Sequence, residues 1–195
     1  IMRNYKKNLE LLTKNYVYSK EMEHDACGVG LIASTEGKKS RAIVEYGIEA
    51  LKAVWHRGAV DADGKTGDGA GIHVEIPKDF FIEKIEVTGH DYDNSEICVG
   101  MIFLPRNDYS SQENCKTIVE SELTKNNFSI YGWRQVPVNP KVLGEKALQT
   151  MPEIIQVLFK SNDPNLLDKN LERKIYETRK IIENKAFNAS LNNFY

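Results

Sequence analysis

The sequence changes character abruptly at Cys27, and this boundary constrains the fold more than any other feature. Residues 1–26 are polar and mixed in charge, with only weak helical periodicity. Residues 27–33 (CGVGLIA) are almost entirely apolar, a short run that is typical of a buried strand. The leader lacks the continuous apolar stretch of a secretory signal and is too acidic for a typical transit peptide. A folded domain is therefore predicted to begin at residue 27.

Strand patterns and amphipathic helix patterns are mixed along the rest of the chain. Helical spacing over 40–55 predicts a helix that buries one face, formed by Val44, Ile48, Leu51 and Trp55. The mixed order predicts an α/β or α+β domain in which helices cover sheets. The other predicted elements are strands over 72–76, 97–104, 128–138 and 153–159, and helices over 112–125 and 165–186.

Charge and cysteine content exclude several classes of partner and location. The chain has 26 basic and 28 acidic residues, so its net charge of -2 gives no general attraction for nucleic acid or anionic lipid. The longest uncharged apolar run, residues 98–104, is too short to cross a bilayer. Three unevenly spaced cysteines form neither a disulfide framework nor a zinc motif, and no metal site is predicted. We therefore expect no nucleic acid and no membrane as partners, and a cytoplasmic location.

Two familiar loop motifs fail between Arg57 and Gly71. Gly64-Lys65-Thr66 resembles the end of a phosphate-binding loop, but the glycine required five positions earlier is Ala59. Residues 61–64 (DADG) begin like a calcium loop, but position twelve is Ile72 instead of a bidentate glutamate. Gly67, Gly69 and Gly71 are predicted to permit tight packing of a sheet instead of binding a ligand.

One combination of motifs remains. Cys27 stands at the start of the apolar run, and thirty residues later His56-Arg57-Gly58-Ala59 leads into residues 66–72 (TGDGAGI). These residues closely resemble the class II glutamine amidotransferase domain at the front of glutamate synthase large chains, a member of the N-terminal nucleophile hydrolase group. The resemblance covers residue 24 to the end and continues in residues 132–138 (GWRQVPV), 143–145 (LGE), 151–152 (MP), 172–174 (ERK) and Arg179.

The resemblance implies an α+β fold of the Ntn-hydrolase type. In this fold two antiparallel sheets pack face to face between helices, as a four-layer αββα sandwich. By the same resemblance, residues 1–26 are a propeptide that is cleaved between Ala26 and Cys27. Residues 27–195 would then be the N-terminal part, about the first half, of the amidotransferase domain.

The resemblance also implies the chemistry. Mature Cys27 would attack the amide carbon of L-glutamine, release ammonia and leave a thioester that water hydrolyses. Its own α-amino group, with an ordinary pKa of about 7.7–8.0, would act as the base. Arg57 and Gly58 would shape the nucleophile pocket and hold the new N-terminus, although a structural ion pair is the alternative for Arg57. The oxyanion residues and the substrate-binding residues that clamp glutamine are expected beyond Tyr195, so the isolated chain is expected to be inactive.

In the family, ammonia passes to 2-oxoglutarate, and the product is reduced with electrons from FMN and a 3Fe-4S cluster. This chain is expected to hold neither cofactor. Implied partners are the remainder of the glutamate synthase chain and either an NADPH- and FAD-containing reductase subunit or ferredoxin. Three alternatives stay open: another class II amidotransferase, another thiol hydrolase of the group, and a degenerate scaffold in which Cys27 is plain core.

Overall fold

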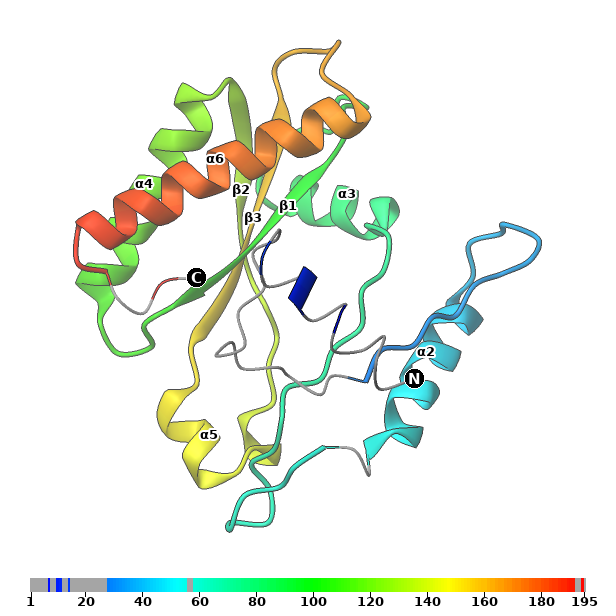
Figure 1. Cartoon of the computed structure of the whole chain (residues 1–195). Helices are drawn as coiled ribbons and strands as arrows, with labels where there is room; N and C mark the ends of the chain where they lie inside the picture. The colour runs from blue at the N-terminus through cyan, green and yellow to red at the C-terminus, as the bar shows by residue number, and fades with distance from the viewer. Residues whose placement is uncertain are drawn as a thin grey trace. The chain divides into compact units, whose positions relative to one another are not determined.

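A computed structural model describes residues 7, 10, 11, 14, 28–55, 58–191 and 194 of the chain. The chain divides into two compact units. The first comprises Ile1–Gly58 with Ala70–Ile72, and its longest described element is helix α2 (Arg41–Ala53) (Figure 1). The second comprises Ala59–Gly69 with His73–Tyr195 and contains a sheet with its covering helices.

The second unit is built on a three-stranded antiparallel sheet. Its strands are β1 (Cys98–Leu104), β2 (Phe128–Gln135) and β3 (Glu153–Ser161), in the order β1-β3-β2. Strand β3 pairs with a neighbour on each edge and is buried over residues 155–159. The three strands lie where the sequence predicted them, and the described fold is α+β.

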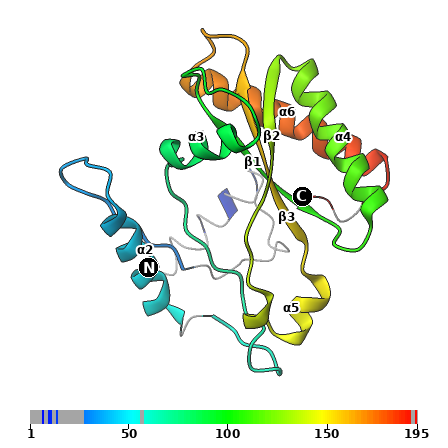
Figure 2. The ribbon, with the colours of Figure 1, turned by 180° about the vertical axis from the view of Figure 1, so that it is seen from behind.

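Helices α4 (Tyr109–Lys125) and α6 (Asp168–Asn188) pack against each other on one face of this sheet (Figures 1 and 2). Alternate residues of β3 point to this face because successive side chains of a strand point to opposite sides. Val157 and Phe159 therefore meet the apolar faces of both helices in the main core cluster. Its buried members are Cys98, Val119, Leu123, Phe128, Val157, Phe159, Leu171 and Ile182.

The opposite face of the sheet is packed by helix α3 (Lys78–Val87). Phe81 and Ile85, one turn apart, form a second core cluster with Tyr131 and Leu158. This helix is not among the predicted elements, and the predicted strand over 72–76 ends directly before Pro77. Proline also suits the start of a helix, because the first amides of a helix lack partners anyway. A short 3-10 helix, η2 (Pro140–Val142), and helix α5 (Glu145–Thr150) connect β2 to β3.

The predicted strands over 27–33 and 72–76 are wrong for the residues that the structure describes. Residues 28–34 and 68–77 have no regular structure, and the side chains of Val29 and Val74 are 93% and 48% exposed. Neither segment has a strand beside it within the described ranges, and a strand needs a partner for its backbone groups. Cys27 itself lies outside the described residues.

Helix α2 confirms the helix predicted over 40–55 but not its burial. No residue of α2 is fully buried, and Trp55, which follows it, is 75% exposed. Within the described part of the chain, none of the helices combines the length and the apolar character needed to cross a membrane.

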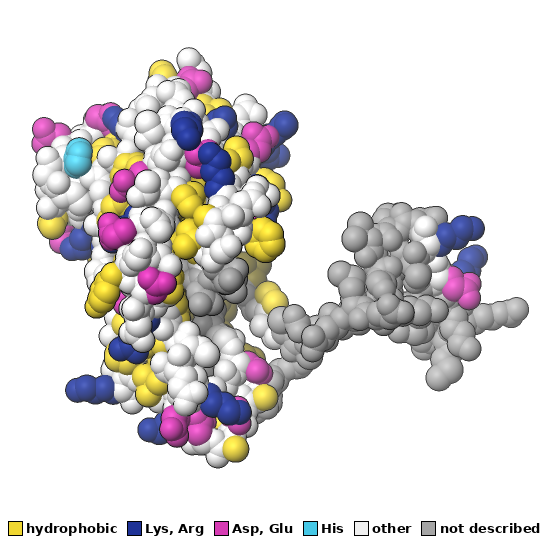
Figure 3. Space-filling view, turned by 90° about the vertical axis from the view of Figure 1, so that its left-hand side faces the viewer, with side chains coloured by type: hydrophobic (Ala, Val, Ile, Leu, Met, Phe, Trp, Pro, Cys, Tyr) yellow, Lys and Arg dark blue, Asp and Glu magenta, His cyan; other side chains and the backbone are white. Residues whose placement is uncertain are grey.

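Acidic and basic side chains are interspersed over the side of the second unit that Figure 3 shows. Many of them pair within one helix, as Lys116 does with Glu113 and Arg173 with Glu177, each at 2.9 Å. Such exposed pairs stabilise a helix only slightly. These pairs therefore serve their own helices, whereas other pairs, such as that of Lys146 with Asp61, join different elements.

Candidate active-site region

Of the three predicted catalytic residues, the structure describes only Gly58. Cys27 and Arg57, like His56, lie outside the described residues. Gly58 is exposed, and its N–H donates to the carbonyl oxygen of Trp55 at 3.0 Å. A Cβ at Gly58 would lie 3.3 Å from that oxygen, closer than most such contacts, so this position favours glycine.

A short hairpin, residues 59–68, begins directly after Gly58. Its two arms meet at a bridge between Val60 and Gly67, and the N–H of Asp61 donates to the Thr66 oxygen at 2.7 Å. At the open end, the N–H of Ala59 donates to Oδ2 of Asp68 at 2.8 Å. A Cβ at Gly67 would lie 2.9 Å from the Ala59 oxygen, so the close approach of the arms requires glycine.

Of the three glycines predicted to permit tight packing of a sheet, only Gly67 is closely packed, and it packs between the arms of the hairpin instead of in a sheet. A Cβ at Gly69 or Gly71 would have no described atom within 4 Å. The expected sheet is absent from the described residues around them, which removes the crowding on which the prediction depended.

Asp63 organises the tip of the hairpin. Its Oδ1 accepts the N–H groups of Lys65 and Thr66 at 2.9 and 2.7 Å, and its Oδ2 accepts the Thr66 hydroxyl at 2.5 Å. These hydrogen bonds, that of the hydroxyl first, hold the pKa of Asp63 well below its usual range. Gly64 beside it has a φ of 69°, which glycine adopts without strain. The carboxylate of Asp63 therefore serves the turn, and its oxygens are already engaged.

The hairpin is fixed to the start of helix α5. Lys146 Nζ donates to Oδ2 of Asp61 at 2.6 Å, across 85 positions of sequence. Gly144 is buried against the tip, and a Cβ there would lie 2.2 Å from Thr66 Oγ1 and 2.5 Å from the Thr66 nitrogen. The structure thus joins two of the motifs behind the family resemblance, residues 66–72 and 143–145. No spacing in the sequence signals this contact, so sequence reasoning missed it.

The two other cysteines do not suit nucleophilic chemistry. Cys98 in β1 and Cys115 in α4 are free and buried. Burial raises the pKa of Cys98 to about 12, helped by Glu96 and Glu172, and burial also raises the pKa of Cys115. Because a thiolate is the reactive form, burial and a raised pKa both disfavour nucleophilic reaction at these two thiols. Of the three cysteines in the sequence, this leaves Cys27 as the candidate nucleophile.

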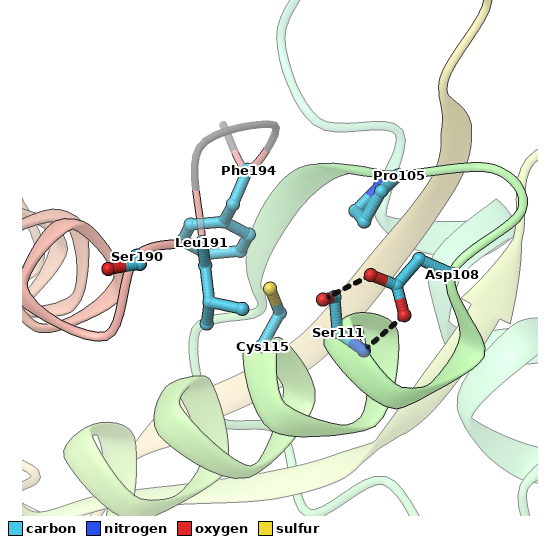
Figure 4. A pocket seen from close by; sticks show the side chains of 7 residues that line it. All are labelled: Pro105, Asp108, Ser111, Cys115, Ser190, Leu191 and Phe194. Atoms are coloured by element: carbon cyan, nitrogen blue, oxygen red, sulfur yellow. Dashed lines mark hydrogen bonds between the residues drawn. The ribbon is translucent and has the colours of Figure 1, made fainter.

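Cys115 borders a cavity of about 130 Å³ at the beginning of α4 (Figure 4). Asp108, the other reactive side chain there, caps the helix by accepting the N–H and hydroxyl of Ser111 at 3.0 and 2.6 Å. The rest of the lining is supplied by Pro105, Ser190, Leu191 and Phe194. The polar groups are used by the helix cap, so the cavity has no free base for the thiol. In the part of the chain that the structure describes, no group of three His, Cys, Asp or Glu residues is placed to hold a metal ion.

Trp133 and Arg134, which are part of the resemblance, make structural contacts from strand β2. Trp133 packs against the main core cluster, and its Nε1 donates to Glu120 Oε1 at 2.7 Å. Arg134 donates to Oε1 of the buried Gln156 at 2.6 Å, and its guanidinium lies over the Phe80 ring, 5.1 Å from the centroid. Trp133 thus ties the sheet to α4, and Arg134 ties it to α3.

A family model and several known proteins match this chain. A family model described as "Glutamine amidotransferases class-II" matches residues 27–195. The glutamate synthase [NADPH] large chain of Azospirillum brasilense is 50% identical over 192 residues, which is 98% of this chain and 13% of that protein.

Two further relatives are more distant. The ferredoxin-dependent glutamate synthase 1 of Arabidopsis thaliana is 40% identical over 83% of this chain and 10% of its own length. The glutamate synthase [NADH] of Saccharomyces cerevisiae is 35% identical over 92% of this chain and 9% of its own length. The chain therefore spans about a tenth of the length of the relatives it matches.

Proposed function

The chain belongs to the class-II glutamine amidotransferases, and we propose that it supplies the glutamine-hydrolysing part of a glutamate synthase. The observation that carries the proposal is the start of the family match at Cys27, the residue whose thiol the chemistry needs. The identity of 50% over 98% of the chain with a glutamate synthase large chain supports the choice of this enzyme over other amidotransferases.

In this proposal, residues 1–26 are removed as a propeptide, and residues 27–195 are the N-terminal part of the amidotransferase domain. Removal of the leader gives Cys27 a free α-amino group, which takes the proton of its thiol. The thiolate attacks the amide carbon of L-glutamine. The C–N bond then breaks, and the nitrogen leaves as ammonia with the transferred proton. Water hydrolyses the resulting thioester to L-glutamate and the free thiol.

Arg57 and Gly58 shape the nucleophile pocket and hold the new N-terminus. Support for this role comes from the residues on each side of the pair. The N–H of Gly58 is held by Trp55, and the hairpin 59–68 is fixed to α5 by Lys146 and Gly144. A residue that holds the new N-terminus in a reactive geometry needs a backbone that is fixed in advance. Close constraints on the backbone beside Arg57 favour such a function.

We also propose that the complete domain is a four-layer αββα sandwich. One face of the sheet is closed by α4 and α6, whereas α3 packs against the other face, where Met101 is still 46% exposed. A second sheet on that face would bury such residues. The exposed apolar side chains of Val74 and Ile76, in the same unit as this sheet, make their segment a suitable strand for it.

The ammonia is used elsewhere in the longer polypeptide, in the cytoplasm, to aminate 2-oxoglutarate. FMN and a 3Fe-4S cluster supply the electrons for that reduction when bound. We assign both to the remainder of the polypeptide, because Cys98 and Cys115 are single buried thiols on different elements and do not suit a cluster. Electrons would come from a reductase subunit with NADPH and FAD or from ferredoxin. The 50% identical relative carries NADPH in its name.

The test is to express the full-length polypeptide and measure its intact mass and its glutamate formation. We expect a mass that lacks residues 1–26, and glutamate formation from either glutamine or added ammonium. Cys27→Ala should abolish only the glutamine-dependent reaction, and Cys115→Ala is the matched control that keeps both. Unchanged glutamine-dependent activity in Cys27→Ala would overturn the proposal and favour a scaffold in which Cys27 is core.

A further inference from the structure

We propose that the outer face of helix α6 is a self-complementary surface that binds a second copy of this chain, with the two α6 helices antiparallel. The surface, which we call the α6 stripe, consists of Tyr176, Lys180, Glu183 and Phe187. All four residues belong to α6 and therefore to the second unit. The inference goes beyond the proposed function, because it concerns the association of the chain and not its chemistry.

The α6 stripe lies on the side of the helix that faces away from the core. Thr178 and Ile182 are buried, with exposed fractions of 1% and 7%, and they lie on the side of α6 that packs on the sheet and α4. At 3.6 residues per turn, the stripe points to roughly the opposite side of the helix. In Figure 1, α6 lies in front of the sheet, so this outer side faces the viewer.

Two large aromatic side chains of the stripe are exposed to solvent. Tyr176 is 55% exposed and Phe187 is 75% exposed. A single exposed apolar side chain is normal on a protein surface. Here, however, the four residues of the stripe follow one another at intervals of four, three and four positions. This is the spacing of the residues that meet a second helix in a coiled coil.

A two-fold axis brings the stripe onto itself with matching chemistry. In a symmetric dimer, residue i of one copy faces residue j of the other, and j faces i. With the axis midway between residues 180 and 183, Lys180 of each copy faces Glu183 of the other, and Tyr176 faces Phe187. A parallel pair would instead place Lys180 against Lys180 and Glu183 against Glu183, and like charges repel. Charge complementarity therefore favours a second copy in the antiparallel direction.

The charged groups of the stripe are already ordered on the single helix. Oε2 of Glu183 accepts a hydrogen bond from Lys180 at 2.6 Å, and its Oε1 accepts one from Arg179 at 2.9 Å. Both cations lie over the Tyr176 ring, 5.5 and 5.8 Å from its centroid. An ammonium group has three donors and a carboxylate accepts several hydrogen bonds, so these groups can keep their contacts and also pair across the axis. Side chains that are already ordered lose less freedom on binding.

The size of the stripe sets the expected strength of the association. It extends over three turns of one helix, roughly 16 Å. A contact of this length is small compared with the interfaces of stable dimers. We therefore expect a weak dimer that forms only in concentrated protein and dissociates further at high salt, because exposed ion pairs are screened.

The experiment measures the dissociation constant of the dimer by sedimentation velocity of the full-length polypeptide over a series of concentrations. Lys180→Glu makes both charges of the stripe acidic, and Glu183→Lys makes both basic. Each variant alone should raise the dissociation constant about 10-fold or more, because attraction becomes repulsion at two symmetric contacts. Lys141→Glu is the matched control, since Lys141 is exposed on η2 in the same unit, and it should change nothing.

An equimolar mixture of Lys180→Glu and Glu183→Lys separates contacts between copies from contacts within one helix. In the mixture, an acidic stripe faces a basic one, so dimers should form again with at least the affinity of the original protein. Restored association would also show that both variants are folded. A rescue of this kind requires that the two positions face each other across two chains.

A pair of cysteines tests the alignment of the helices. Tyr176→Cys and Phe187→Cys in the same chain should form disulfides between two copies under copper-catalysed oxidation, seen by mass spectrometry as linked peptides that contain positions 176 and 187. Within one helix these positions lie roughly 16 Å apart, whereas the Cα atoms of a disulfide lie within about 7 Å. Tyr176→Cys alone is the control and should give no link between two copies of position 176.

Three results would overturn the inference. The first is a dissociation constant of Lys180→Glu that equals that of Lys141→Glu. The second is a mixture of the two charge variants that associates no better than either variant alone. The third is a monomeric polypeptide in which the thiol of Tyr176→Cys resists a soluble thiol reagent, which would show that the remainder of the polypeptide covers the stripe.

Discussion

The sheet and the segments 28–34 and 72–76 carry similar apolar sequence patterns, but only the sheet is buried. Val157 on β3 is 2% exposed, whereas Val29 and Val74 are 93% and 48% exposed. Strand β3 has a hydrogen-bonded strand on each edge and packed side chains on each face. The difference teaches that apolar alternation defines a strand only where the same chain supplies partners for its edges and its faces.

The difference in burial also predicts a difference in how much each region contributes to stability. Full burial of a valine or leucine side chain contributes about 1.5–3 kcal/mol, and an exposed one contributes almost nothing. The free energy of unfolding of residues 1–195 is therefore expected to depend on the sheet and its helices, and little on the two exposed segments.

The largest effect is expected for Phe128→Ala. Phe128 is 2% exposed and meets Phe159 edge to face, with ring centroids 5.3 Å apart. Removal of its ring leaves a cavity under α4 and α6 and should lower the free energy of unfolding by about 3–5 kcal/mol. Phe187→Ala is the matched control, because Phe187 is 75% exposed and should change it by less than about 0.5 kcal/mol. Urea unfolding followed by circular dichroism measures both. Equal effects of the two variants would contradict the assignment of this core.

Gly100→Ala should lower the free energy of unfolding by less than Phe128→Ala, but by more than an alanine substitution outside the sheet. A Cβ at Gly100 would lie 2.7 Å from Cγ1 of Val157, its partner on β3, so the variant overpacks the core. We expect a loss of about 1–3 kcal/mol. Gly47→Ala in α2 is the control, since its Cβ meets open space and alanine favours a helix by about 0.5–1 kcal/mol. Thermal unfolding of both variants gives the comparison, and a Gly100→Ala protein as stable as the original would refute the close contact.

The strands of the sheet could be predicted from the sequence because each combines residues of high β propensity with a short, largely apolar run between turns. Helix α3 was not predicted because only Phe81 and Ile85 mark its buried face, and a proline such as Pro77 fits the end of a strand as well as the start of a helix. The strands over 27–33 and 72–76 were mispredicted because a local pattern does not show whether a partner strand exists.

The candidate site was predictable only in part. The motifs that contain Cys27, Arg57 and Gly58 indicated the family, and the family match confirms that assignment. The roles of these three residues stay a prediction. The contact of the hairpin with Gly144 and Lys146 joins residues about 80 positions apart and leaves no periodic signal. Asp68 has an ordinary sequence context for a loop aspartate, so its bond to Ala59 appears only in three dimensions.

Glu122 gives the next prediction, which depends on pH. Its side chain is 5% exposed and accepts hydrogen bonds from Lys185 at 2.6 Å and Lys125 at 3.0 Å. These lysines, Lys185 first, lower the pKa of Glu122. A carboxyl whose folded pKa is lowered contributes stability above its unfolded pKa of about 4.3, and this contribution is lost as the pH falls through the folded pKa.

Glu122→Gln should therefore reduce the free energy of unfolding at pH 7 by about 1–2 kcal/mol, because both lysines are partly exposed to solvent. The difference between the two proteins should shrink below about pH 4. Urea unfolding from pH 3 to 7 measures it. Glu177→Gln, which breaks the exposed pair with Arg173, is the control and should be nearly neutral. A difference that stays constant with pH would refute the role of the ionised carboxylate.

The smallest effect is expected for Val74→Thr, which lies in a segment that also tests the proposed second sheet. In residues 1–195, the half-exposed Val74 should tolerate a hydroxyl with a change in the free energy of unfolding below about 0.5 kcal/mol, whereas Val157→Thr places the hydroxyl in the core and should cost about 1–3 kcal/mol.

In the full-length polypeptide, a second sheet would pair the backbone of residues 72–76. Hydrogen exchange of a peptide spanning these residues should then be fast in residues 1–195 and slow in the full-length protein. Equally fast exchange in both would show that this segment is no strand of a second sheet. The apolar alternation at residues 72–76 would then have to be explained by side-chain packing alone.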